Sequence, residues 1–214
     1  MKKACIILNG KSENYNNIKE ILAKNKYDYI ICADGGANHI YNMDIVPDYI
    51  IGDLDSVDSS IVNYYKNLNI KFERFPSKKN ETDTELCIYL AKNLKVKEID
   101  FYFALGGRID HTIANINLLY LVKSIGMIPT IISEKEIIQI AINEEIEIKG
   151  NIGDTVSVIP LSGDAKGVTL TNFEYPLEEY DMKFYLPLGI SNVMLENKCR
   201  VKVNEGSVLV IRNI

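Results

Sequence analysis

The amino-acid sequence predicts an α/β protein in which a parallel-sheet domain is followed by an antiparallel β domain. Up to about residue 125, short apolar runs with strand character alternate with segments whose apolar residues have helical spacing. This alternation indicates a parallel sheet with helices on its faces, a Rossmann-like arrangement. After Pro129 the sequence changes to short β-type runs separated by Gly, Pro, Asn and Asp, which is typical of a sandwich. A chain of 214 residues is long enough for both domains.

Strands and helices of the first part have recognisable ends. The first strand stops at the turn signal Asn9-Gly10, and Thr82 with Glu85 forms a capping box at a helix start. The expected strands are Ala4–Leu8, Tyr27–Ala33, Tyr49–Ile51, Lys71–Phe75 and Ile99–Leu105. The expected helices are Asn14–Lys24, a short one through His39 and Ile40, Ser59–Leu68, Thr82–Leu94 and Asp110–Ile125.

The second part is expected to be all β. Its strand-like runs are Thr130–Ile132, Glu145–Ile148, Thr155–Ile159, Phe184–Leu186, Val193–Leu195, Arg200–Val203 and Ser207–Ile211. We place the boundary near residues 126–134, which gives an α/β domain at 1–128 and a β-sandwich domain at 129–214.

Composition excludes several classes of protein. A hydrophobic fraction of 47% and a charged fraction of 25% are those of an ordinary globular protein. The net charge of −5 differs from the basic charge that is typical of nucleic-acid-binding proteins, and it gives no attraction to anionic lipid. The 4 cysteines are far apart, so neither a zinc site nor a disulfide framework is indicated. No signal peptide or bilayer-spanning stretch is found, and we expect a cytoplasmic protein without nucleic-acid or membrane partners.

The segment Tyr49–Ser56 is the first candidate site. An apolar strand ends at Gly52 and is followed by Asp53 and Asp55, which point the same way in an extended chain. Two close carboxylates repel unless a cation or protons lie between them, and Mg²⁺ is the cation that such a pair usually holds. The alternative is a polar loop that only caps the next helix.

Other strand and helix ends carry similar residues. Because the carboxyl ends of parallel strands meet at one edge, these residues are expected to converge there. The Gly-Gly pairs would let a phosphate approach the backbone and the following helix start, and an arginine suits phosphate as well. The residues concerned are Asp34, Gly35 and Gly36, then Thr82, Asp83 and Glu85, then Gly106, Gly107, Arg108, Asp110 and His111.

Each of these residues also has a structural explanation. Asp110 could be only an N-cap, and Glu85 is better explained by the capping box than by a ligand role. His39 is expected at a helix surface or an interface. Lys78 and Lys79 could be solvated charges or phosphate contacts, with the two alternatives equally open.

Taken together, these motifs resemble those of the thiamine pyrophosphokinase family. The matching segments, in the family's order, are CADGGAN at Cys32–Asn38, GDLDS at Gly52–Ser56, TDTE at Thr82–Glu85 and GGRIDH at Gly106–His111. In the second part, Gly189–Asn192 (GISN) resembles a thiamine-contacting segment of the family. The resemblance implies an N-terminal α/β domain, a C-terminal β domain, and a homodimer with substrate sites between subunits.

The resemblance also implies the reaction and the residues. Members transfer pyrophosphate from ATP to the hydroxyethyl group of thiamine with Mg²⁺, and release AMP. By resemblance, the acidic cluster that holds Mg²⁺ and the polyphosphate is Asp53, Asp55 and Asp83, joined by Asp34. Nucleotide contacts would come from Asp34, Gly35, Gly36, Gly106, Gly107, Arg108, Asp110 and His111, and thiamine contacts from Ser191 and Asn192.

The chemistry leaves some choices open. Phosphoryl-type transfer needs positioning and charge neutralisation more than an activated nucleophile. Either Asp83 or Asp55 could accept the proton of the thiamine hydroxyl. A rival hypothesis is a haloacid-dehalogenase-type phosphatase, because Asp53–Val57 fits D-x-D-x-[TV] with Asp53 as nucleophile; however, that motif usually follows the first strand of the core. A second rival is a regulatory module that binds nucleotide or thiamine without turnover.

Overall fold

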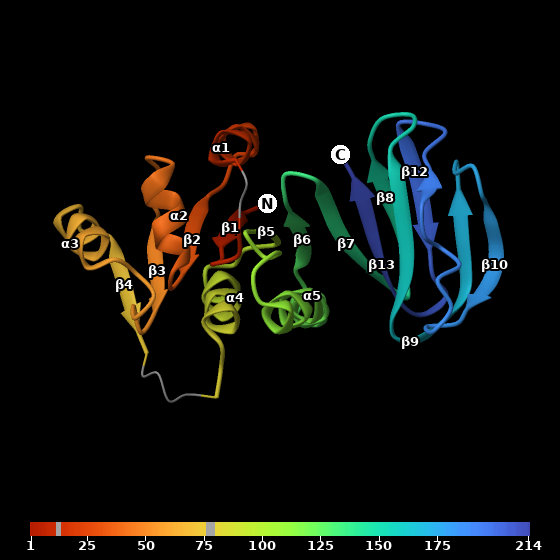
Figure 1. Ribbon diagram of the computed structural model, residues 1–214. Coiled ribbons are helices and arrows are strands. Elements are labelled where there is room, and N and C mark those ends of the chain that lie inside the picture. The colour runs from red at the N-terminus through yellow and green to blue at the C-terminus, as the bar shows by residue number, and fades with distance from the viewer. Residues whose placement is uncertain (12–13, 76–79) are drawn as a thin grey trace. The chain divides into compact units, whose positions relative to one another are not determined.

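The first of two units, Met1–Glu134, is built around a parallel sheet. The computed structural model describes residues 1–11, 14–75 and 80–214. The strand order of the sheet is β4-β3-β2-β1-β5-β6 (Figure 1). The strands are β1 (Lys3–Ile7), β2 (Tyr29–Ala33), β3 (Tyr49–Gly52), β4 (Lys71–Arg74), β5 (Glu98–Tyr102) and β6 (Ile128–Ile132). Since β1 pairs with β2 on one side and β5 on the other, the strand order reverses at the β1–β5 pair. A crevice for a ligand is expected outside the carboxyl ends at that point.

Helices cover both faces of this sheet. They are α1 (Tyr15–Lys24), α2 (Gly36–Asn42), α3 (Ser59–Asn67), α4 (Asp83–Asn93) and α5 (Ile109–Ser124). The first three bury Leu22, Ile40 and Tyr65 in one apolar core with side chains of the central strands. The last two lie on the other side of the sheet (Figure 1) and bury residues such as Ile88 and Leu119. Burial of this apolar surface is the main stabilising contribution to the sheet.

Helix starts follow the expected capping chemistry in two cases and depart from it in a third. Asn14 accepts the N–H of Asn16 at the start of α1, and Thr82 with Glu85 forms the predicted capping box of α4. The N-cap of α5 is Arg108, without a side-chain cap. The alternative that Asp110 is only an N-cap is therefore wrong, because this residue already lies inside the helix.

The second unit, Lys135–Ile214, is an antiparallel sandwich. Its strands are β7 (Glu136–Ile142), β8 (Glu145–Lys149), β9 (Thr155–Thr171), β10 (Leu177–Met182), β11 (Asn192–Val193), β12 (Lys198–Lys202) and β13 (Glu205–Asn213). The long β9 belongs to both sheets: its first part pairs with β13, and its last part pairs with β10 and β12. Ser162 and Gly163, between these parts, have positive φ angles of 68° and 128°. The α/β domain followed by a β-sandwich is the predicted fold class.

Two expectations for the β runs need correction. Phe184–Leu186, expected to be a strand, is a turn, in which Asp164 accepts the N–H of Phe184 and pairs with Lys183. The apolar side chains of this turn are exposed, so apolar character alone misled the prediction. The run Thr130–Ile132 lies in β6, which pairs in parallel with β5 and completes the first unit's sheet.

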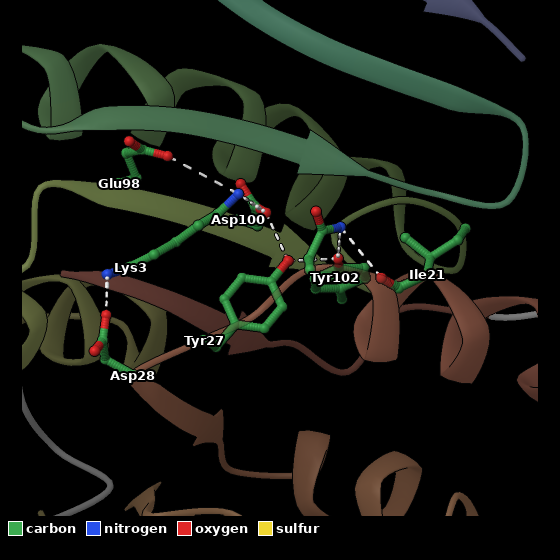
Figure 2. A network of polar contacts seen from close by, with 8 residues as sticks. Lys3, Ile21, Tyr27, Asp28, Glu98, Asp100 and Tyr102 are labelled. Carbon is green, nitrogen blue, oxygen red and sulfur yellow. Dashed lines mark hydrogen bonds and ion pairs between the residues drawn. The ribbon is translucent and has the colours of Figure 1, made fainter. Parts of the chain in front are cut away.

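A buried polar network joins β1 to β5 (Figure 2). Asp100, only 3% exposed, receives the ammonium of Lys3 at 2.7 Å and the hydroxyl of Tyr27 at 2.6 Å. The Tyr27 hydroxyl also lies 2.6 Å from the hydroxyl of Tyr102, to which Asn25 donates. Burial raises the pKa of Asp100, while Lys3 and Tyr27 act to lower it. The network therefore links β1 and β5, the pair of strands at which the strand order reverses.

Replacing Lys3 by methionine tests this network. Lys3→Met leaves the buried Asp100 carboxylate without its cation, so the free energy of unfolding at pH 7 should fall by about 3 kcal/mol. The raised pKa of Asp100 rises further in this variant, and the folded state then binds a proton more readily than the unfolded chain. The deficit relative to wild type should therefore shrink as the pH is lowered, as measured by urea unfolding at several pH values.

The double variant Lys3→Met/Asp100→Asn is the control, because it removes the titrating group. Its difference in stability from the single variant Asp100→Asn should not change with pH across the same range, because neither protein carries the titrating carboxylate. A Lys3→Met protein as stable as wild type at pH 7, or a deficit that stays constant with pH, would contradict this description of the network.

Candidate functional site

The carboxyl end of β2 turns directly into α2 and presents Asp34. The Asp34 N–H donates to the carbonyl of Ile51 on β3 at 2.7 Å, and Asp34 has a positive φ of 42°, which is uncommon for a non-glycine residue. Two residues later, a Cβ on Gly36 would lie 2.1 Å from the carbonyl oxygen of Ile7. Only glycine therefore lets α2 start against the end of β1, which fixes the direction of this turn.

The end of β3 presents Asp53 and Asp55 beside Asp34. A Cβ on Gly52, whose φ is +147°, would lie 2.9 Å from the Cβ of Asp34, so this glycine allows the two strand ends to come close. Leu54 between the two aspartates has a φ of 67°. Such strained conformations persist where the surroundings hold them, and they are enriched at functional sites.

One side chain ties the two strand ends together. Asn38 on α2 donates to the carbonyl of Ser56 at 2.8 Å and accepts the N–H of Asp58 at 3.2 Å. The Ser56 hydroxyl donates to Asp55 at 2.9 Å. Asn38 therefore holds the loop after β3 against α2, and the bond between Ser56 and Asp55 stabilises the loop internally.

Three carboxylates meet at this edge. One oxygen from each of Asp34, Asp53 and Asp55 lies within 4.8 Å of the others. Asp34 is half-buried, and its Oδ1 atom is shielded from solvent and has no hydrogen-bond partner in the described part of the chain. Burial is the largest cause of the raised pKa of Asp34, and the charges of Asp83 and Asp55 raise it further. Asp83, the first residue of α4, is thus near enough to act on Asp34 although it lies outside the three-carboxylate group.

This arrangement fits a hard divalent cation. The site has an excess of negative charge, oxygen donors only, and one solvent-shielded oxygen that no group among the described residues satisfies. These are properties of a site for Mg²⁺, which prefers carboxylate oxygens together with phosphate oxygens. Asp34, expected to join the cluster of Asp53, Asp55 and Asp83, supplies one of the three carboxylates that the structure brings together.

The turn after β5 carries the second Gly-Gly pair. Gly106 and Gly107 have φ angles of 78° and 77°, which favour glycine. Arg108 binds the carboxylate of Asp110 with two hydrogen bonds, of 2.5 Å and 3.1 Å, and this pair lowers the pKa of Asp110. Both side chains are exposed, as is His111. Arg108 and Asp110 therefore bind one another at the start of α5.

The loop after β1 was missed by the sequence analysis, which interpreted Asn9-Gly10 only as a turn. Gly10 donates to the carbonyl of Phe103 at 2.8 Å, and Lys11 donates to the carbonyl of Leu105 at 3.2 Å. The loop thus lies against the turn after β5. The signal that could have identified it is the strand order, which places β1 between the two strands that carry Gly-Gly turns.

His39 is not a simple surface residue. Its ring stacks on Phe103 with centroids 4.1 Å apart, and its Nδ1 lies 2.8 Å from the hydroxyl of Tyr15. Burial lowers the pKa of His39. The two lysines Lys78 and Lys79 lie outside the described residues, so their interpretation remains a prediction.

In the second unit, Ser191 and Asn192 are neighbours with different environments. Ser191 is exposed, has a positive φ of 59°, and its N–H donates to the Ser157 hydroxyl. Asn192 is 4% exposed, and its amide accepts the N–H of Tyr175 and donates to the carbonyl of the same residue. Asn192 therefore anchors the segment that carries the exposed Tyr175 ring. Contact of either residue with thiamine stays a prediction.

No helix within the described residues is long and apolar enough to cross a membrane.

Comparison with known proteins gives a consistent result for both units. The family descriptions "Thiamin pyrophosphokinase, catalytic domain" and "Thiamin pyrophosphokinase, vitamin B1 binding domain" match residues 21–128 and 138–208. The chain is 28% identical to thiamine pyrophosphokinase 1 of Arabidopsis thaliana over 197 residues, 80% of this chain and 73% of that protein. It is 27% identical to thiamine pyrophosphokinase of Bacillus subtilis over 184 residues, 86% of each chain.

Solved structures agree with these matches. The crystal structure of thiamine pyrophosphokinase from Bacillus subtilis superposes with a TM-score of 0.88 at 25% identity, over 99% of both chains. Thiamin pyrophosphokinase from Candida albicans superposes with a TM-score of 0.84 at 22% identity, over 100% of this chain and 89% of that one. The second comparison supports the fold.

Neutralising Asp34 tests the electrostatics of the site. Without divalent cations, Asp34→Asn should raise the free energy of unfolding at pH 7 by about 1 kcal/mol, because it removes a half-buried carboxylate from a negative cluster. Since the pKa of Asp34 is raised, its destabilising effect is lost as the pH falls through that pKa, and the gain should disappear there. Added Mg²⁺ should stabilise wild type more than the variant.

Thermal unfolding with and without MgCl₂ measures both effects. Asp58→Asn is the matched control, since Asp58 lies on the same loop, is exposed and caps α3 with no side-chain bond. If Asp34→Asn were less stable than wild type in the absence of Mg²⁺, the repulsion described here would be absent.

Proposed function

Because the chain belongs to the thiamin pyrophosphokinase family, we propose that it transfers the pyrophosphate group of ATP to thiamine, forming thiamine diphosphate and AMP with Mg²⁺. Thiamine diphosphokinase activity itself follows from the family. The nucleotide, the leaving group and the metal are the proposed parts. The observation that carries them is the group of Asp34, Asp53 and Asp55 at the carboxyl edge of the parallel sheet, beside two Gly-Gly turns.

The proposed reaction is a displacement at the β-phosphorus of ATP. The hydroxyl oxygen of thiamine forms a bond to this phosphorus, and the bond to the oxygen bridging the α- and β-phosphates breaks, so that AMP leaves with the bonding electrons. The proton of the hydroxyl passes to a carboxylate, for which Asp55 and Asp83 are the candidates. Catalysis of such a step depends chiefly on positioning and on neutralising charge.

Asp53, Asp55 and Asp83 are proposed as the residues that hold the metal, with Asp34 completing the acidic group. When bound, Mg²⁺ would supply positive charge that offsets the negative charge developing on the phosphate groups. The raised pKa of Asp34 supports this assignment, because a bound cation would offset both the burial that chiefly raises it and the repulsion from Asp83 and Asp55 that adds to it.

The glycine turns and the helix starts behind them are proposed to receive the nucleotide. Gly35, Gly36, Gly106 and Gly107 leave the backbone accessible, and helix N-termini favour phosphate. Arg108, Asp110 and His111 are proposed as further nucleotide contacts; Arg108 would have to exchange or share its bond to Asp110. Ser191 and Asn192 are proposed to contact thiamine.

The assembly and the location rest on the sequence alone. We propose a homodimer with the substrate sites formed between subunits, as the family resemblance implies, and a cytoplasmic location. The phosphatase hypothesis is set aside by the family assignment. A module that binds without turnover is distinguished by the following assay.

Replacing Asp53 by asparagine tests the proposed function. With ATP, Mg²⁺ and thiamine, wild type should release AMP and form thiamine diphosphate in equal amounts, as measured by chromatography. Asp53→Asn should lose at least about a hundredfold in turnover, because a metal-ligating charge is removed. The fold should be retained, since Asp53 follows β3 rather than lying in the core.

Asp58→Asn serves again as the control and should keep wild-type turnover. Near-normal AMP release by Asp53→Asn would count against the metal assignment. Binding of both substrates by wild type without AMP release would favour the regulatory module instead.

A further inference from the structure

The loop after β1, Asn9–Lys11, lies at the point where the strand order reverses. β1 leads to α1 on one face of the sheet, and β5 leads to α5 on the other face (Figure 1). The carboxyl ends of such a strand pair border the crevice in which doubly wound sheets bind their ligands. The acidic group at β2 and β3 lies to one side of this point, and the turn with Gly106 lies at the other side.

The loop lies between the turn with Gly35 and Gly36 and the turn with Gly106 and Gly107, and it contacts both. A Cβ on Gly35 would lie 2.3 Å from the Nδ2 atom of Asn9. Gly35 has an ordinary right-handed conformation, with φ of −56°, so its backbone does not require glycine. The close approach of the Asn9 amide therefore accounts for the small residue at position 35.

Contacts on the other side of the loop are made mostly by backbone. A Cβ on Gly10 would lie 2.3 Å from the carbonyl oxygen of Phe103 and 2.4 Å from that of Leu105. A Cβ on Gly106 would lie 3.3 Å from the Cβ of Lys11. Phe103 has a positive φ of 54°, and its ring is held by stacking on His39. The position of Lys11 is thus determined by the turn that also carries the second Gly-Gly pair.

Charge is the reason to assign a role to Lys11. The acidic group gathers carboxylates at the ends of β2 and β3, Asp83 at the start of α4 is near enough to act on Asp34, and the polyphosphate of ATP adds further negative charge. The guanidinium of Arg108 is engaged by Asp110. Lys11 is exposed and forms no ion pair within the parts of the chain that the structure describes. An ammonium on a flexible stem is a suitable point charge for phosphate.

We propose that the loop Asn9–Lys11 is a third wall of the nucleotide site and that Lys11 binds the polyphosphate of ATP. This inference rests on the proposed function, because it takes ATP as the substrate. Lys11 is a substrate-positioning residue here: it neutralises phosphate charge from the side opposite the acidic group, and Asn9 and Gly10 hold it there. No proton or covalent transfer is assigned to it.

Lys11→Gln tests the inference, with Lys11→Arg as the charge-conserving variant. Lys11→Gln should raise the KM for ATP roughly tenfold, as expected for loss of a hydrogen bond to a charged group. The KM for thiamine should stay within about twofold of wild type. In equilibrium binding with Mg²⁺, the affinity for ATP should fall more than that for AMP, because the lost contact is to the outer phosphates. Lys11→Arg should restore most of the ATP affinity.

Lys24→Gln is the matched control, since Lys24 is an exposed lysine in the last turn of α1, at the opposite end of that helix from the loop. It should leave both KM values unchanged. Equal KM values for ATP in Lys11→Gln and Lys24→Gln would overturn the inference, as would equal losses of affinity for ATP and AMP. Absence of turnover in wild type would overturn the proposed function, whereas the comparison of ATP binding would still decide the role of Lys11.

Discussion

Repulsion between carboxylates held at one edge of the parallel sheet is the constraint on which the first unit depends. Two strand ends bring one oxygen each of Asp34, Asp53 and Asp55 within 4.8 Å of one another, and one oxygen of Asp34 has no hydrogen-bond partner among residues 1–11, 14–75 and 80–214. Without a cation, such an arrangement destabilises the folded protein, and it therefore favours binding of a cation. The glycine at position 52 makes it possible, because any larger residue would push Asp34 away.

The remainder of the unit compensates for this local cost. The apolar core beneath α1, α2 and α3 supplies most of the stabilisation. Within the sheet, Lys3 of β1 and Tyr27 both bind the buried carboxylate of Asp100 on β5. The sheet thus treats carboxylates in two ways: Asp100 on β5 is paired within the protein, and the group that follows β2 and β3 is left for a ligand.

Much of this arrangement could be predicted from the sequence, because it depends on local patterns. The sequence predicts the alternation of strands and helices and the capping box of Thr82 and Glu85. It also predicts that carboxylates gather at strand ends. What could not be predicted depends on pairing between distant segments. The role of the loop after β1 follows from the strand order, and the turn at Phe184–Leu186 depends on its bonds to Asp164. The polar, exposed strand β10 lacked the apolar alternation on which strand predictions rely.

The most direct test of the central claim is a crystal structure of the protein with a non-hydrolysable ATP analogue, Mg²⁺ and thiamine. The account predicts that the ion is bound by oxygens of Asp53, Asp55 and Asp83 together with phosphate oxygens of the analogue, at about 2.1 Å. An ion bound elsewhere, with these carboxylates directed into solvent, would contradict the claim that the sheet edge is built around a divalent cation.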